Sequence, residues 1–275
     1  MSDNPYLRGC LTALAVALVL GLLRRAGPRA GGLAAAIPVT SVPALAWMAW
    51  EQGADFAAAS ATAALLATGM TGLFALFYAL LARRHQAALA LIGAAVPALA
   101  LTVAVSGLGR HLAWSLGGAT LLILSCLMAM PAASPVQRRS THWRRDLLLT
   151  MAVSGAVTTA ISLIAPRVPA LLCGLVAAIP VIGMCTTVSV HARSGSAAVT
   201  QFLDAYLRGL LAKIVFLGVL ASLLPLLGAG LPWLLAAASG VATVLALPLL
   251  RLDLGRRSAV VRAVRSSSRP AGQLR

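Results

Sequence analysis

Three polar residues interrupt an apolar segment in the last third of the chain, and they have the spacing of one helix face. Gln201, Asp204 and Arg208 follow an i, i+3, i+7 pattern, and the last two can pair at i, i+4. A charged side chain in an apolar medium is costly, so its presence there indicates a function by default. For Arg208 the hypothesis is that it binds an anion. The alternative is a structural ion pair. Lys213 either adds positive potential to that site or extends to a polar surface.

Groups suited to catalysis or metal binding do not come together along the sequence. Asp204 is the only one of six acidic residues deep within an apolar segment, so neighbouring positions offer no carboxylate pair and no metal-ligand cluster. Phosphate-binding, dinucleotide-binding and nucleophile-elbow motifs are absent. The cysteines form no CxxC pair: Cys10, Cys126, Cys173 and Cys185. The histidines lie at the ends of apolar segments, where a solvated loop role is expected: His85, His111, His142 and His191. We therefore expect no enzyme, no metal and no cofactor.

One eight-residue phrase occurs twice, as GLAAAIPV at 32–39 and as GLVAAIPV at 174–181. The copies lie 142 residues apart, and each places a proline, Pro38 or Pro180, inside an apolar segment. Because proline removes a backbone donor and clashes with the preceding turn, each segment is predicted to be an interrupted helix.

Hydroxyl-bearing and small residues follow both prolines. Ser41 is expected to cap the half-helix after the first break, with Pro43 in its first turn. Interrupted helices are where many transporters hold solutes and ions. The predicted binding residues are Pro38, Thr40, Ser41, Pro180, Gly183, Thr186, Thr187, Asp204 and Arg208. The alternative is that the two phrases serve only kinked, close helix packing, to which small residues are equally suited.

The composition is that of a multi-spanning membrane protein. Of 275 residues, 60% are hydrophobic and only 10% are charged, and long apolar runs follow one another with short connections. The net charge is +16, but the arginines lie in short loops beside apolar segments rather than in one basic patch. We therefore expect the lipid bilayer, and not nucleic acid, as the partner.

Nine helical spans are predicted, and the arginines orient them. The spans cover residues 8–23, 31–50, 55–82, 87–106, 112–130, 147–165, 168–190, 197–224 and 231–250. With this count, 17 arginines lie on one side, whereas Arg8, Arg110 and Arg167 lie on the other. Because positive residues remain inside, the N-terminus is predicted outside and the C-terminus in the cytoplasm.

The repeated phrase divides the membrane domain, residues 1–250, into two halves. Repeat one covers about 8–106, a linking span covers 112–130, and repeat two covers about 147–250. Five spans precede the second copy, so it enters the membrane from the opposite side. This arrangement is an inverted repeat. Residues 251–275 are predicted to be a disordered, basic cytoplasmic tail.

The stretch GGLAAAIPVTSVPALAWMAWEQGADFA, residues 31–57, resembles the GlpM-like group of bacterial inner-membrane proteins. The resemblance rests on its GGLxAxxP opening and its trailing EQG, and the second copy has HARSG in place of the latter. It implies a small membrane protein of the bacterial inner membrane. It implies no reaction, ligand or catalytic residue.

These observations predict an all-α transporter or permease-like protein for a small solute, with an anionic solute as one option. The first alternative is a membrane assembly or scaffold subunit whose interrupted helices serve only packing. The second is an intramembrane enzyme acting on lipid. Faces rich in small residues are also suited to oligomerisation.

Overall fold

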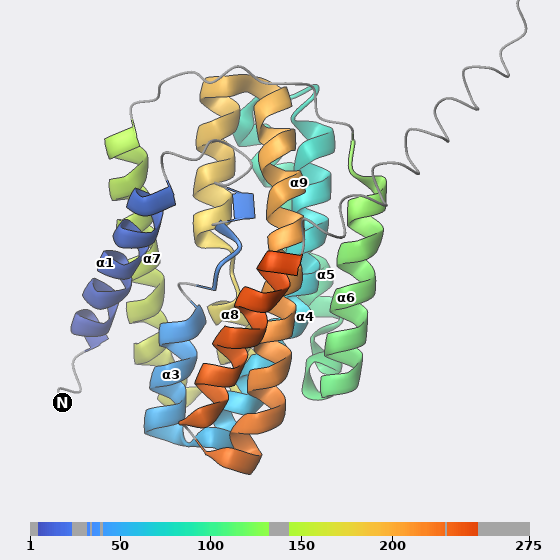
Figure 1. Cartoon of the computed structure of the whole chain (residues 1–275). Helices are drawn as coiled ribbons and strands as arrows, with labels where there is room; N and C mark the ends of the chain where they lie inside the picture. The colour runs from blue at the N-terminus through green and yellow to red at the C-terminus, as the bar shows by residue number, and fades with distance from the viewer. Residues whose placement is uncertain are drawn as a thin grey trace, which may run out of the picture.

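The computed structural model describes residues 5–23, 32–33, 35–38, 41–131, 143–228 and 230–246 (Figure 1). Within these ranges every regular element is a helix, which confirms the predicted all-α class. The α-helices are α1 (Pro5–Leu23), α3 (Ser41–Gln52), α4 (Ala54–Leu81), α5 (Ala87–Ala104), α6 (Leu112–Ala129), α7 (Trp143–Ile164), α8 (Ala170–Ala177) and α9 (Val181–Leu227), followed by a helix at Leu231–Ala246. Two short 3-10 helices, η2 (Ser106–Arg110) and η3 (Ala165–Arg167), precede α6 and α8. The predicted tail at 251–275 lies outside the described residues.

Four stretches of the described chain are long and apolar enough to cross a membrane. They are Ala54–Leu81, Ala87–Ala104, Leu112–Ala129 and Ala170–Leu227. Each of the first three coincides with one span predicted from the sequence, whereas the fourth covers two predicted spans, 168–190 and 197–224. Their number, length and apolarity indicate an integral membrane protein.

The fourth stretch folds back on itself. It contains 58 residues, about 87 Å of straight helix against a hydrocarbon core of about 30 Å. Within α9, Gly195 has φ 77° and ψ −176°, a conformation that favours glycine. At this residue the chain reverses direction (Figure 1), so α9 consists of a first limb, 181–194, and a second limb, 196–227.

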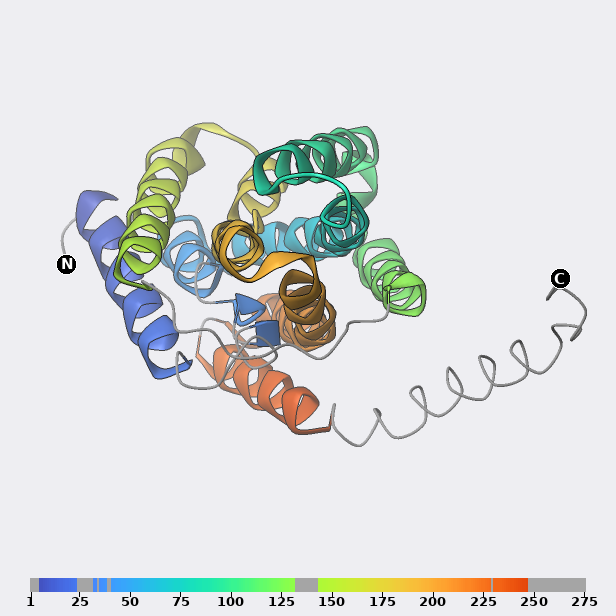
Figure 2. The same ribbon diagram turned by 90° about the horizontal axis from the view of Figure 1, so that it is seen from above.

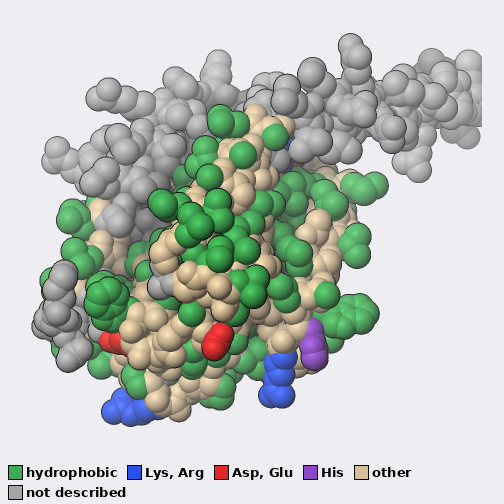
Figure 3. Space-filling view, turned by 60° about the horizontal axis from the view of Figure 1, so that its bottom comes forward, with side chains coloured by type: hydrophobic (Ala, Val, Ile, Leu, Met, Phe, Trp, Pro, Cys, Tyr) green, Lys and Arg blue, Asp and Glu red, His purple; other side chains and the backbone are tan. Residues whose placement is uncertain are grey.

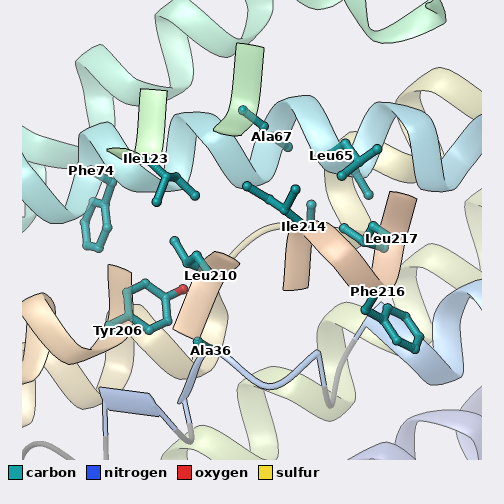
Figure 4. Close-up of a cluster of buried hydrophobic side chains, with 14 of the residues drawn as sticks. Ala36, Leu65, Ala67, Phe74, Ile123, Tyr206, Leu210, Ile214, Phe216 and Leu217 are labelled. Carbon is teal, nitrogen blue, oxygen red and sulfur yellow. The ribbon is translucent and has the colours of Figure 1, made fainter. Parts of the chain in front are cut away.

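The core lies between α4 and α9, which form the most extensive interface between described elements. The interface between α1 and α7 is nearly as extensive. Seen from above, α4 and both limbs of α9 are central, with α1 and α7 at one edge and α6 at the other (Figure 2). Leu65 of α4 gathers with Ile214 and Leu217 of α9 in this core (Figure 4). Many of the buried residues of α4 are alanines, which lets neighbouring helices approach closely.

Helices α1 and α7 pack through glycine. A Cβ atom added to Gly9 would stand 2.7 Å from the carbonyl oxygen of Gly155, and one added to Gly155 would stand 3.0 Å from the carbonyl oxygen of Gly9. Such close backbone approach is typical of membrane helix pairs. The predicted use of small residues for packing is therefore present between these two helices.

The outer helices expose apolar side chains. On α5 the exposed positions include Leu89, Ile92, Val96, Leu99 and Val103. Figure 3 shows hydrophobic side chains spread over the face turned to the viewer, with few charged ones among them. A surface of this kind suits contact with lipid tails.

Candidate functional site

The first copy of the phrase contains a helix break at its proline. Gly32 and Ala35 are helical, and the amide of Ala36 donates to the carbonyl oxygen of Gly32 at 3.3 Å. Pro38 is not helical, and α3 begins at Ser41. The predicted interruption is therefore present. Thr40, one of the predicted binding residues, lies outside the described residues.

The second copy breaks in the same way. Helix α8 ends at Ala177, and the amide of Ala178 donates to the carbonyl oxygen of Gly174 at 3.1 Å. Pro180, with φ −82° and ψ 59°, precedes α9 and accepts a hydrogen bond from the amide of Met184 at 2.8 Å. Pro38 likewise accepts a bond of 2.8 Å from Val42. The predicted interruption at Pro180 is confirmed, and the hydrogen bonds around it repeat those at Pro38.

The two breaks are joined by a buried hydrogen bond. The hydroxyl of Ser41 donates to the carbonyl oxygen of Ala177 at 2.9 Å, across 136 residues of sequence. Ala177 ends α8, so its carbonyl is one of those that a helix terminus leaves unpaired. The sequence predicts Ser41 as a cap for its own half-helix. Instead, its hydroxyl satisfies the carbonyl at the end of the opposite one.

Each phrase also packs on the long helix of the other half. A Cβ atom at Gly32 would overlap the carbonyl oxygen of Phe202 and stand 2.9 Å from the Cβ of Ala205. At Gly174 it would overlap the carbonyl oxygen of Ser60 and stand 2.9 Å from the Cβ of Ala63. Every residue of the second contact lies 142 positions from its counterpart in the first, the same spacing that separates the two phrases.

The same spacing relates two helix starts. Gly53 has φ 91° immediately before α4, and Gly195 has φ 77° immediately before the second limb of α9. Both residues adopt a backbone conformation that L-amino acids rarely take. The two long core helices therefore begin at equivalent glycine turns.

Tyr206 lies against the first turn of α9 after the second break and against the start of the first phrase, and sequence reasoning missed it. A Cβ atom at Gly183 would stand 2.7 Å from the Tyr206 hydroxyl, and one at Gly32 would stand 2.9 Å from its backbone nitrogen. The ring is buried and stacks on Phe202, with centroids 6.1 Å apart. No hydrogen bond joins its hydroxyl to another described residue. An aromatic residue in an apolar span normally indicates core packing, so only the fold reveals this position.

The threonines after the second break differ in environment. Thr187 is buried and donates to the carbonyl oxygen of Gly183 at 2.6 Å, one turn before it. Thr186 is partly exposed. Of these two predicted binding residues, Thr187 is therefore held by its own helix and Thr186 has a more open position.

Asp204 and Arg208 form the predicted i, i+4 pair. Arg208 donates to both carboxylate oxygens, from Nε at 3.1 Å and from Nη2 at 3.0 Å. The side chains of Arg208 and Asp204 are 22% and 31% exposed, respectively. This two-point geometry matches the fixed fork of the guanidinium and neutralises its charge locally. The sequence left two hypotheses, an anion site at Arg208 and a structural ion pair, and the geometry favours the ion pair.

Lys213 differs from Arg208 in its surroundings. It is only 7% exposed, and no ion pair or hydrogen bond joins its ammonium to any other residue in the described part of the chain. A buried charge without a partner is unfavourable in a protein interior.

His191 is a second residue whose setting the sequence does not predict. Its Nδ1 lies 3.1 Å from the hydroxyl of Tyr78, and the two rings meet edge to face with centroids 5.7 Å apart. The sequence assigns His191 to a solvated span end. In the structure it links the last turns of α4 to the first limb of α9. His85 and His111 are exposed, as predicted.

Among the described residues, no group of three His, Cys, Asp or Glu side chains is placed to hold a metal ion. None of the four cysteines, all of which lie in the described part of the chain, takes part in a disulfide. The chain matches no protein-family model, no curated protein and no solved structure. The resemblance to the GlpM-like group therefore stays a prediction, and the geometry of the two helix breaks carries the functional argument.

Proposed function

We propose that this chain is a membrane transporter built as an inverted repeat, with its solute site where the two helix breaks meet. The observation that carries the proposal is the buried hydrogen bond from Ser41 to Ala177, which joins the breaks in the protein interior. In membranes, broken helices are tolerated where protein covers them or where they line a cavity. Transporters place such breaks at the interface between their repeats.

The reciprocal contacts of Gly32 and Gly174 support the inverted repeat, because a two-fold axis relates each contact to its counterpart. Helix directions support it as well. In Figure 1, α1 runs opposite to α7, α3 opposite to the first limb of α9, and α4 opposite to the second limb. A two-fold axis in the membrane plane reverses helices in this way, whereas an axis along the membrane normal does not. The repeats would cover about 8–106 and 147–250, giving nine crossings in all.

Charge at the two ends supports the proposed orientation in a bacterial inner membrane. The α4–α5 turn carries the exposed Arg83 and Arg84, and it lies at the same end as the Gly195 turn, next to Arg193 (Figure 1). Arg110 and Arg167 end the 3-10 helices at the opposite end. The first end carries Arg83, Arg84 and Arg193, which the sequence assigns to the arginine-rich side, so it would face the cytoplasm.

We expect the N-terminus to be accessible from outside the cell. A variant with Ser2 replaced by Cys and the four native cysteines removed should react with a membrane-impermeant thiol reagent in intact spheroplasts. A cysteine introduced in the loop at 134–145 should react only after permeabilisation. Protection of position 2 together with labelling of the loop would reverse the orientation.

We expect the purified protein in proteoliposomes to carry at least one class of small polar solute. The measurement is uptake of a radiolabelled panel of neutral and anionic solutes, compared with protein-free vesicles. To cover coupling to either protons or sodium ions, each solute is tested with a proton gradient, with a sodium gradient and with no gradient. A scaffold subunit would give no flux under any condition and would instead be recovered from the membrane in a stable complex with other proteins.

A further inference from the structure

Lys213 lies on the face of α9 that follows the first phrase. Gly32 packs beside Ala205, and Ala36 packs beside Gly209, where a Cβ atom would stand 2.5 Å from the Cβ of Ala36. Both contacts advance by four residues, so the phrase runs alongside α9 in the same direction. Figure 4 shows Ala36 beneath Tyr206 and Leu210. The next turn of this face carries Lys213.

Continuing this register by one turn of α9 would bring Lys213 level with the break. Pro38 follows Ala36 by two residues, and α3 begins three residues later at Ser41. On α9 the same step of four residues beyond Gly209 reaches Lys213. The residue 142 positions earlier is Thr71, which is buried on α4 and donates to the carbonyl oxygen of Ala67 at 2.9 Å. Only the first break therefore has a cation at this position.

No negative charge among the described residues balances Lys213. The first turn of α3 contains no acidic residue, and its amide groups present the positive end of the helix dipole toward the break. Asp204, the one acidic residue deep in the same span, already accepts two hydrogen bonds from Arg208. Lys213 remains nine-tenths buried with no bonding partner in the described chain.

We propose that Lys213 is the residue through which the break at Pro38 binds a small organic solute carrying one negative charge. This proposal rests on the proposed transport function and names its substrate class. One unbalanced ammonium neutralises one carboxylate, because Arg208 is already paired. Tyr206 lies seven residues earlier on the same face, about 10 Å along the helix. Its buried hydroxyl supplies a hydrogen bond to the uncharged part of the solute.

Ligand binding to the purified protein tests this proposal independently of transport. Thermal unfolding is measured in neutral detergent with acetate, lactate, gluconate, succinate, inorganic phosphate or glucose, and separately with phosphatidylglycerol. We expect at least one monocarboxylate to raise the wild-type midpoint in a saturable manner, whereas glucose leaves it unchanged. Phosphatidylglycerol tests the other source of a single negative charge, a lipid headgroup.

Three variants locate the effect. Lys213→Gln should weaken monocarboxylate binding roughly 10- to 100-fold, since a charge-assisted hydrogen bond is lost. Lys213→Arg keeps the charge and should keep the response. Arg83→Gln removes one positive charge from an exposed turn and should match the wild type. If Lys213→Gln does not fold, the thermal response of the wild type and of Lys213→Arg to the monocarboxylates tests the proposal.

Stabilisation of Lys213→Gln by the same anions at the same concentrations would overturn the proposal, as would a wild type that responds to no monocarboxylate. Stabilisation by phosphatidylglycerol alone would make the bound anion a lipid and overturn the solute assignment. Uptake of a neutral solute that is equal in wild type and Lys213→Gln would retain the transport function and reject the charged substrate.

Discussion

Replacing Gly174 by alanine is expected to destabilise the folded protein by about 3 kcal/mol or more. The added Cβ atom would overlap the carbonyl oxygen of Ser60. That oxygen belongs to the backbone of α4 and cannot turn aside as a flexible side chain can. Either the broken helix or α4 must move. The measurement is thermal unfolding in detergent, with the monodisperse fraction followed by size-exclusion chromatography.

Gly32→Ala should show a loss of similar size, because its Cβ atom would overlap the carbonyl oxygen of Phe202. Gly117→Ala and Gly118→Ala are the matched controls. Both glycines lie in α6 with no atom within 4 Å of an added Cβ, so alanine should be neutral or stabilising by up to about 1 kcal/mol. If Gly174→Ala were as stable as the wild type, this result would contradict the close packing of the phrase on α4.

Joining the two breaks by a disulfide is expected to stop uptake. Ser41→Cys and Ala177→Cys, at the two residues that the buried hydrogen bond joins, are introduced together in a background free of the four native cysteines. If solute passes between the breaks, they must separate during the cycle. Oxidation should lower uptake at least about tenfold, and a reductant should restore it.

Two controls separate locking from damage. Each single-cysteine variant, treated with the same oxidant, should keep its uptake, and the double variant should be active before oxidation. Cross-linking should be verified by a mobility shift on the gel. Complete cross-linking with unchanged uptake would show that the breaks do not separate, and it would move the pathway elsewhere in the protein.

The helix breaks could be predicted from the sequence because their cause is local. Pro38 and Pro180 each lack the amide that a continuous helix requires, wherever the rest of the chain lies. The helical class and several span limits were also predictable, since they depend on apolar length alone. Helix α4, for example, covers Ala54–Leu81 against a predicted 55–82.

The partners across the breaks could not be predicted in this way. The bond from Ser41 to Ala177 and the pairing of Tyr78 with His191 join residues more than one hundred positions apart. The burial of Lys213 depends on how α9 is rotated against the first phrase. The pair Asp204 and Arg208 was predictable because its geometry lies within one helix.

The glycine contact between the halves also imposes an order on biosynthesis. Gly32 packs on Phe202, which is translated 170 residues later, an interval of about 10 to 30 s at ordinary elongation rates. Gly174 meets Ser60, which is already in the membrane when the second phrase emerges. The first broken helix must therefore wait with its packing face uncovered, whereas the second can dock as soon as it is made.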